Sequence, residues 1–145
     1  MTLARLNNLS ASLLTSKLDA VILNPGPTLT YLTGLDFHLM ERPVVLFVTP
    51  GQDPVLVLPE LELPKVELFP YKVQAFAYGE NPSEWDNAFR KAMQALGLDG
   101  KRIGVLRRSR GHGNESARLD DAVERRAVHH EVAQHRESVG APRFQ

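Results

Sequence analysis

Apolar side chains recur at helical spacing in two stretches of the chain. Residues 2–18 place five leucines on one arc at about 100° per residue: Leu3, Leu6, Leu9, Leu13 and Leu14. Residues 83–96 place five apolar side chains on one face: Trp85, Phe89, Ala92, Met93 and Leu96. Thr2 is expected to cap the first helix. Ser83 is expected to cap the second, with Gly97 ending it.

Short apolar runs bounded by turn residues predict strands. Five such runs occur, at residues 20–23, 44–48, 54–58, 73–78 and 103–106. The turn at residues 50–53 predicts that the second and third strands form an antiparallel hairpin. Residues 29–33 predict one helical turn ending at Gly34, and residues 60–68 suggest a short helix interrupted by Pro64. This mixture predicts an α/β domain with helices covering a mixed sheet.

Composition narrows the possible functions. The 145 residues hold 17 basic and 17 acidic side chains, so the net charge is zero, which argues against a nucleic-acid partner. No cysteine is present, which excludes disulfides, thiolate metal sites and a cysteine nucleophile. The apolar runs are too short to span a bilayer, and the first residues lack signal-peptide order. We therefore expect a soluble cytoplasmic protein without a membrane partner.

Charge composition changes near residue 106. Residues 107–145 contain eight of the basic residues, all of them arginine, and four of the five histidines, with no lysine or isoleucine. This shift predicts a folded domain at residues 1–106. It predicts an atypical Arg/His-rich segment at residues 107–145, helical or disordered. The composition of that segment is also typical of a GC-rich gene read in another frame, so a frameshift origin is one hypothesis.

Two segments carry residue types that are typical of functional sites. His130 and His135 flank a glutamate as in a zinc-protease helix, but they are five residues apart and do not share a helical face. The loop at residues 35–43 gathers Asp36, His38 and Arg42 between a helical turn and a strand. Loops on a rigid scaffold often carry binding groups. The alternative is an exposed connection with a weak surface pair between Glu41 and Arg42.

An ordered series of short motifs resembles a known family. The motifs are LDAVILNP at residues 18–25, TYLTG at 30–34, ERP at 41–43, LPE at 58–60 and KRIGV at 101–105. Together they resemble the N-terminal domain of the creatinase/prolidase (Xaa-Pro peptidase) family over roughly residues 3–105. The resemblance implies a ribonuclease H-like α/β fold with a mixed sheet flanked by helices.

The resemblance also implies a role. In this family the N-terminal domain is not catalytic and precedes a "pita-bread" domain, which binds two divalent metal ions through two aspartates, a histidine and two glutamates. No motif here matches those ligands, so neither catalytic residues nor a metal cofactor are expected for this chain. It is expected to stop before the catalytic domain. The family role is to form a homodimer and to border the substrate cleft, where Asp36, His38 and Arg42 are the expected residues.

Two alternatives stay open. The chain could itself be a Xaa-Pro dipeptidase or aminopeptidase, with the histidines after residue 106 supplying a metal site. It could instead be a stand-alone interaction module that self-associates or pairs with a full-length relative. A family domain without its usual neighbour would expose apolar surface, and exposed apolar patches favour association.

Overall fold

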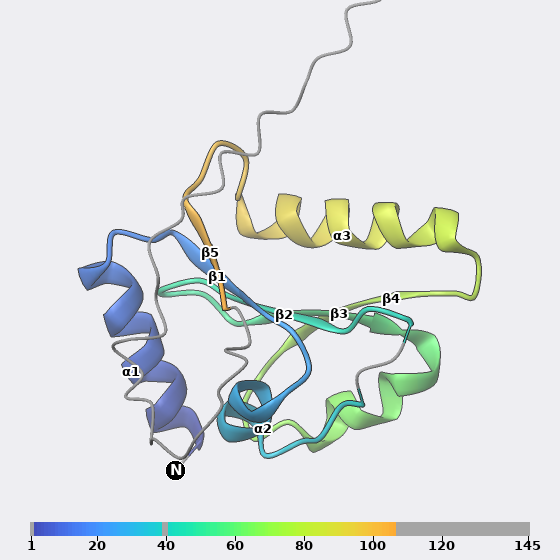
Figure 1. The fold of residues 1–145 in the computed structure, drawn as a ribbon, viewed down its shortest axis with the longest axis horizontal. Coiled ribbons are helices and arrows are strands. Elements are labelled where there is room, and N and C mark those ends of the chain that lie inside the picture. Colours follow the sequence, from blue (N-terminus) through green and yellow to red (C-terminus); the bar gives the residue numbers. More distant parts are fainter. Residues whose placement is uncertain (1, 39–40, 107–145) are drawn as a thin grey trace, which may run out of the picture.

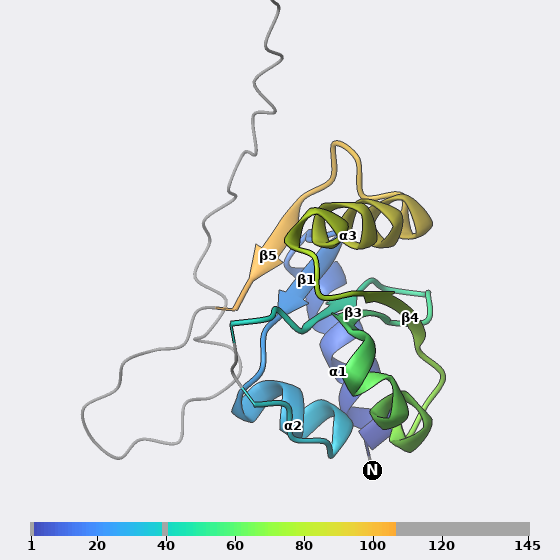
Figure 2. The same ribbon diagram turned by 90° about the vertical axis from the view of Figure 1, so that its right-hand side faces the viewer.

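The computed structural model describes residues 2–38 and 41–106, which form a five-stranded sheet with helical elements on both faces (Figures 1 and 2). The elements in chain order are α1 (Thr2–Thr15), β1 (Ala20–Leu23), α2 (Pro27–Thr33), β2 (Val45–Val48), β3 (Val55–Pro59), the 3₁₀ helix η1 (Glu60–Leu68), β4 (Gln74–Tyr78), α3 (Pro82–Leu96) and β5 (Ile103–Val105). The predicted α/β class is therefore confirmed.

The sheet is mixed, with the strand order β4-β3-β2-β1-β5. β2 pairs antiparallel with both β1 and β3, whereas β4 runs parallel to β3 and β5 runs parallel to β1. In the β2–β3 pair Val45 lies opposite Val57, which confirms the predicted hairpin. The turn between them contains Gly51 with a φ of 75°, a conformation that glycine adopts without steric cost.

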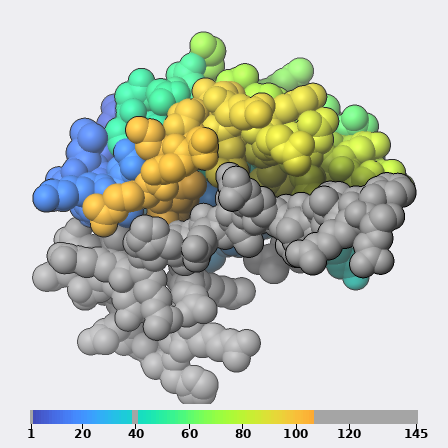
Figure 3. All heavy atoms as spheres, turned by 90° about the horizontal axis from the view of Figure 1, so that it is seen from above, coloured from blue at the N-terminus to red at the C-terminus, as the bar shows by residue number. Residues whose placement is uncertain are grey.

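Successive side chains of the strands enter two separate cores. On β2, Val45 and Phe47 face α3, while Leu46 and Val48 face the layer of α1, α2 and η1. Figure 3 views the molecule from the α3 side, with α3 in yellow and the segment that contains β5 in orange beside it. Burial on both faces explains why the strand sequences are continuous apolar runs rather than alternating ones.

Helix α1 is shorter than predicted, since it ends at Thr15 rather than at residue 18. Lys17 takes the left-handed conformation with a φ of 56°. Its amide donates to the Leu14 carbonyl at 3.1 Å, and the Leu18 amide donates to the Leu13 carbonyl at 2.9 Å. These two bonds satisfy carbonyls at the helix end. They turn the chain toward β1.

Helix α3 begins earlier than predicted, and the expected cap at Ser83 is wrong. Pro82 is the first helical residue and Asn81 is the cap, because the Asn81 side chain accepts a hydrogen bond from the Ser83 amide at 3.1 Å. Proline suits the first helical turn, where its missing N–H costs nothing. The predicted end at Gly97 is confirmed, with a φ of 63°.

Candidate functional site

The loop at residues 35–43 joins α2 to β2, and its first end is held by an aromatic contact. Phe37 is 3% exposed, and its ring centroid lies 6.4 Å from that of Phe69. The Lys65 ammonium on η1 lies 4.9 Å from the Phe37 ring centroid, a favourable cation–π arrangement. The same group donates a hydrogen bond to the Asp36 carbonyl oxygen at 3.2 Å. The backbone of Asp36 is thereby held, while the residue itself is exposed.

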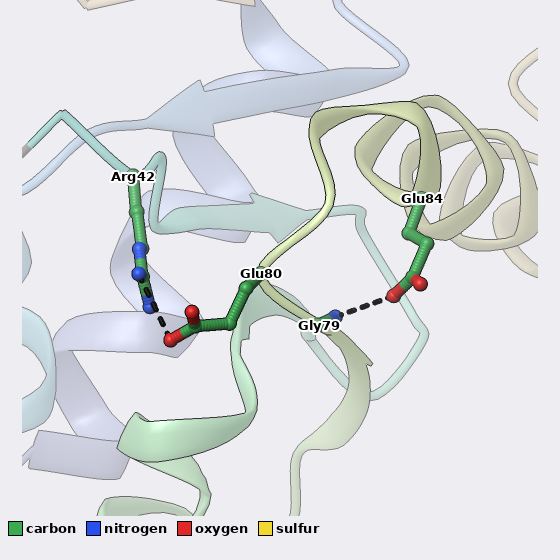
Figure 4. A network of polar contacts seen from close by, with 4 residues as sticks. All are labelled: Arg42, Gly79, Glu80 and Glu84. Carbon is green, nitrogen blue, oxygen red and sulfur yellow. Dashed lines mark hydrogen bonds and ion pairs between the residues drawn. The ribbon is translucent and has the colours of Figure 1, made fainter.

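The second end of the loop is held by an ion pair. Arg42 Nη2 lies 3.1 Å from Glu80 Oε1, in the turn between β4 and α3 (Figure 4). The Arg42 side chain is 34% exposed and that of Glu80 is 79% exposed. A pair this exposed adds about 0–1 kcal/mol to stability. It directs the guanidinium toward Glu80 and not toward its neighbour Glu41, so the surface pair expected between Glu41 and Arg42 is wrong.

Tyr78 reinforces this end of the loop. Its hydroxyl donates a hydrogen bond to the carbonyl oxygen of Pro43, the residue after Arg42. Burial raises the pKa of Tyr78 to about 12, although the positive charge of Arg42 acts in the opposite direction. The phenol therefore stays protonated at neutral pH and keeps donating to the loop.

The turn that carries Glu80 is itself fixed by the start of α3. The Gly79 amide donates to Glu84 Oε2 at 2.9 Å (Figure 4). Asn81 caps the helix on the other side of Glu80. The sequence pattern did not indicate Glu80 as the partner of Arg42. The only local indication was that Glu80 is a carboxylate among residues typical of turns. The pairing joins positions 38 residues apart.

Asp36, His38 and Arg42 are all accessible but are held by different neighbours. Asp36 is tied to η1 through its carbonyl, whereas Arg42 is tied to the turn before α3. His38 is exposed. Among the residues that the structure describes, no hydrogen bond or ion pair joins the three side chains to one another. The structure therefore does not join the three side chains in one bonded cluster.

The described residues do not offer the donor set of a metal centre. Within residues 2–38 and 41–106, no group of three or more histidines, aspartates and glutamates is placed to hold a metal ion. The carboxylate of Glu62 is paired with the Lys65 ammonium at 2.7 Å. The two metal ions that the resemblance implies for the full-length family do not fit these residues. His130 and His135 lie outside the described residues.

Two surface grooves lie away from this loop. One, of about 240 Å³, lies between the end of α1, the turn after β2 and the end of α3. The other, of about 680 Å³, lies between α1, the β2–β3 turn and the segment before β4. Neither groove is lined by the described residues of the loop, 35–38 and 41–43. In the described part of the chain, every helix is too short or too polar to cross a bilayer.

Comparison with known proteins identifies the family. The family model for the creatinase/prolidase N-terminal domain matches residues 5–137. This match continues past the boundary predicted at residue 106, into residues that the structure does not describe. No curated protein matches the chain.

Solved structures share this fold. A proline dipeptidase from Streptococcus pneumoniae is 33% identical over 69% of this chain and 71% of that chain, with a TM-score of 0.57. The creatinase/prolidase N-terminal domain of an X-Pro dipeptidase from Streptococcus pyogenes is 21% identical over 71% of this chain and 93% of that chain, with a TM-score of 0.55.

A longer relative shows how much of a dipeptidase this chain spans. Dipeptidase PepE from Mycobacterium ulcerans is 23% identical, with a TM-score of 0.62 over 84% of this chain. The match spans only 32% of that chain, about a third of its length. The mixed sheet, the helical layers and the family match agree: this chain belongs to the creatinase/prolidase N-terminal domain family.

Proposed function

We propose that this chain serves as the non-catalytic N-terminal part of a Xaa-Pro dipeptidase-like metallopeptidase. In this role it supports a homodimer, and its loop at residues 35–43 borders a substrate cleft. The observation that carries the proposal is the double anchoring of that loop, through Phe37 at one end and Arg42 at the other. Anchoring limits the entropy lost when exposed side chains meet a substrate.

The chemistry of the loop suits a peptide substrate. Arg42 is bound to Glu80 by one Nη2 contact, while an arginine carries five N–H donors. The remaining donors can recognise a peptide carboxylate, a group that guanidinium binds in a bidentate manner. Asp36 and His38, which belong to the same loop, are exposed and can contact the polar groups of a peptide.

The metal chemistry of this proposed enzyme belongs to a different part of it. Hydrolysis by a two-metal site needs ions that activate water and polarise the scissile carbonyl. The donor set around the loop does not fit such a site. The chain is therefore proposed to need no cofactor of its own, and its proposed partner is a second copy or a full-length relative.

The purified 145-residue chain should not hydrolyse a Xaa-Pro dipeptide, with or without added Mn²⁺. The reason is that the described residues lack a set of metal ligands. The assay measures release of free proline. A full-length Xaa-Pro dipeptidase at the same molar concentration is the positive control. Turnover that rises with added Mn²⁺ and disappears with a chelator would favour the alternative that this chain is itself a dipeptidase.

The loop is tested in a chimera in which residues 2–106 replace the matching domain of a full-length Xaa-Pro dipeptidase. Arg42→Ala should raise KM for a dipeptide about tenfold and leave kcat nearly unchanged, because a charge-assisted contact used equally in the ground and transition states is lost. The matched control is Arg90→Ala, which removes an exposed arginine from α3. Equal KM values for the two variants would contradict the role given to the loop.

A further inference from the structure

The smaller of the two surface grooves lies where two helices end. It has a volume of about 240 Å³ and is bounded by the end of α1, the turn after β2 and the end of α3. Figure 1 shows both helix ends at the end of the sheet where β1 begins. We call it the helix-end groove. Its lining includes Leu14, Asp19, Thr49, Leu96, Leu98 and Lys101.

Two opposite charges line the helix-end groove without pairing with each other. Asp19 is half-buried, and its Oδ2 atom accepts a hydrogen bond from the Arg102 amide at 2.8 Å. The second carboxylate oxygen of Asp19 can still accept a donor. Lys101 is exposed, and the ion pairs among the described residues do not include one between Asp19 and Lys101. One groove therefore presents an acceptor for a cation and a donor for an anion.

The lining also contains a buried hydroxyl group. Thr49 is 7% exposed, and its Oγ1 atom has no hydrogen-bond partner among the described residues. Burying a hydroxyl without a partner is unfavourable, so such groups are rare in folded proteins and call for an explanation. A polar ligand atom in the groove would give this hydroxyl its partner.

The rest of the lining is largely apolar. Leu96 and Leu98 are buried at the end of α3, whereas Leu14 on α1 is 67% exposed. Pockets that hold drug-sized ligands have volumes of roughly 300–1,000 Å³. The helix-end groove is smaller than these, so it fits a small molecule with one short apolar group.

We propose that the helix-end groove binds a free α-amino acid with an apolar side chain. The ammonium group of the ligand contacts the carboxylate of Asp19, and its carboxylate contacts Lys101 and accepts a hydrogen bond from the Thr49 hydroxyl. The apolar side chain packs against the leucines of the groove. This inference does not depend on the proposed peptidase role, because the groove lies away from the loop at residues 35–43.

A titration of the ¹⁵N-labelled full chain with L-leucine tests the proposal. Amide resonances of residues that line the groove should shift and saturate. Two analogues separate the charges of leucine: 3-methylbutylamine lacks the carboxylate, and 4-methylpentanoate lacks the ammonium group. Each analogue should bind at least about tenfold more weakly than leucine, because it loses one charge-assisted contact.

Three variants test the residues one at a time. Asp19→Asn keeps an oxygen for the Arg102 amide but removes the negative charge, and Lys101→Met removes the positive charge. Each should weaken leucine binding about tenfold. Thr49→Val keeps the shape of the side chain and removes the hydroxyl. It should weaken leucine binding without lowering the urea midpoint of the unliganded chain, because no hydrogen bond among the described residues is lost.

The matched control is Asp53→Asn with Lys72→Met, which removes two opposite charges that line the larger groove instead. This variant should bind leucine as the unmodified chain does. Resonances that do not saturate with leucine would overturn the proposal. So would equal affinities for leucine and either analogue, since one charge would then suffice. Unchanged leucine binding in both the Asp19 and Lys101 variants would overturn it as well.

Discussion

Phe47→Ala is expected to lower the free energy of unfolding by about 3–5 kcal/mol. Phe47 is 1% exposed at the centre of β2, and its ring lies edge-on to that of Phe89 on α3 with centroids 6.4 Å apart. Truncation removes apolar contacts and leaves a cavity between the sheet and the helix. For a domain of this size the loss is a large part of total stability.

Urea denaturation followed by circular dichroism measures this loss. The control is Leu14→Ala, which truncates a side chain that is 67% exposed on α1 and should change stability by less than about 1 kcal/mol. If Phe47→Ala cost no more than the control, the core between α3 and the sheet would not be packed as described.

Raising the pH from 10 to 12 should destabilise the fold through two tyrosines. Burial raises the pKa of both Tyr71 and Tyr78 to about 12 from the ordinary value of 10.0. The folded state therefore favours the neutral phenols. The resulting stability is fully present below pH 10 and is lost as the pH rises through 12. By linkage, the stability lost over this pH range grows with the difference between the folded and unfolded pKa values of each tyrosine.

Denaturation midpoints between pH 9 and pH 12 measure this effect. Tyr71 donates to the Leu32 carbonyl at 3.1 Å, and Tyr78 donates to the Pro43 carbonyl, so ionisation also removes two tertiary hydrogen bonds. Replacing both tyrosines with phenylalanine should lower stability at pH 8 but flatten the dependence above pH 10. Tyr31→Phe is the control, since Tyr31 is 46% exposed. An equally steep pH dependence in the double variant would contradict this account.

Local sequence patterns predicted the strands well, because burial alone explains their apolar runs. Continuous apolar runs predicted β2 and β3 because both faces of these strands are buried. Helix ends were less well predicted. α1 stops at Thr15 because Lys17 adopts the left-handed conformation and turns the chain toward β1.

The candidate loop at residues 35–43 was also predicted only in part. Its charged residues were predicted from the sequence, but the anchors came from elsewhere in the fold. Lys65 reaches Asp36 from η1 and Glu80 reaches Arg42 from the turn before α3. These contacts span 29 and 38 residues, so no local pattern could indicate them.

The sequence by itself determined the burial of the strands, the amphipathic helices and the motifs that mark the family, because these depend on residues close together in the chain. Apart from the β2–β3 hairpin, which its turn predicted, the tertiary structure decided which elements meet. The parallel pairing of β3 with β4 sets Tyr78 opposite Pro59. This register brings the Tyr78 hydroxyl to the Pro43 carbonyl, and the turn after β4 brings Glu80 to Arg42. Such contacts follow from strand register and helix packing, which are properties of the whole domain.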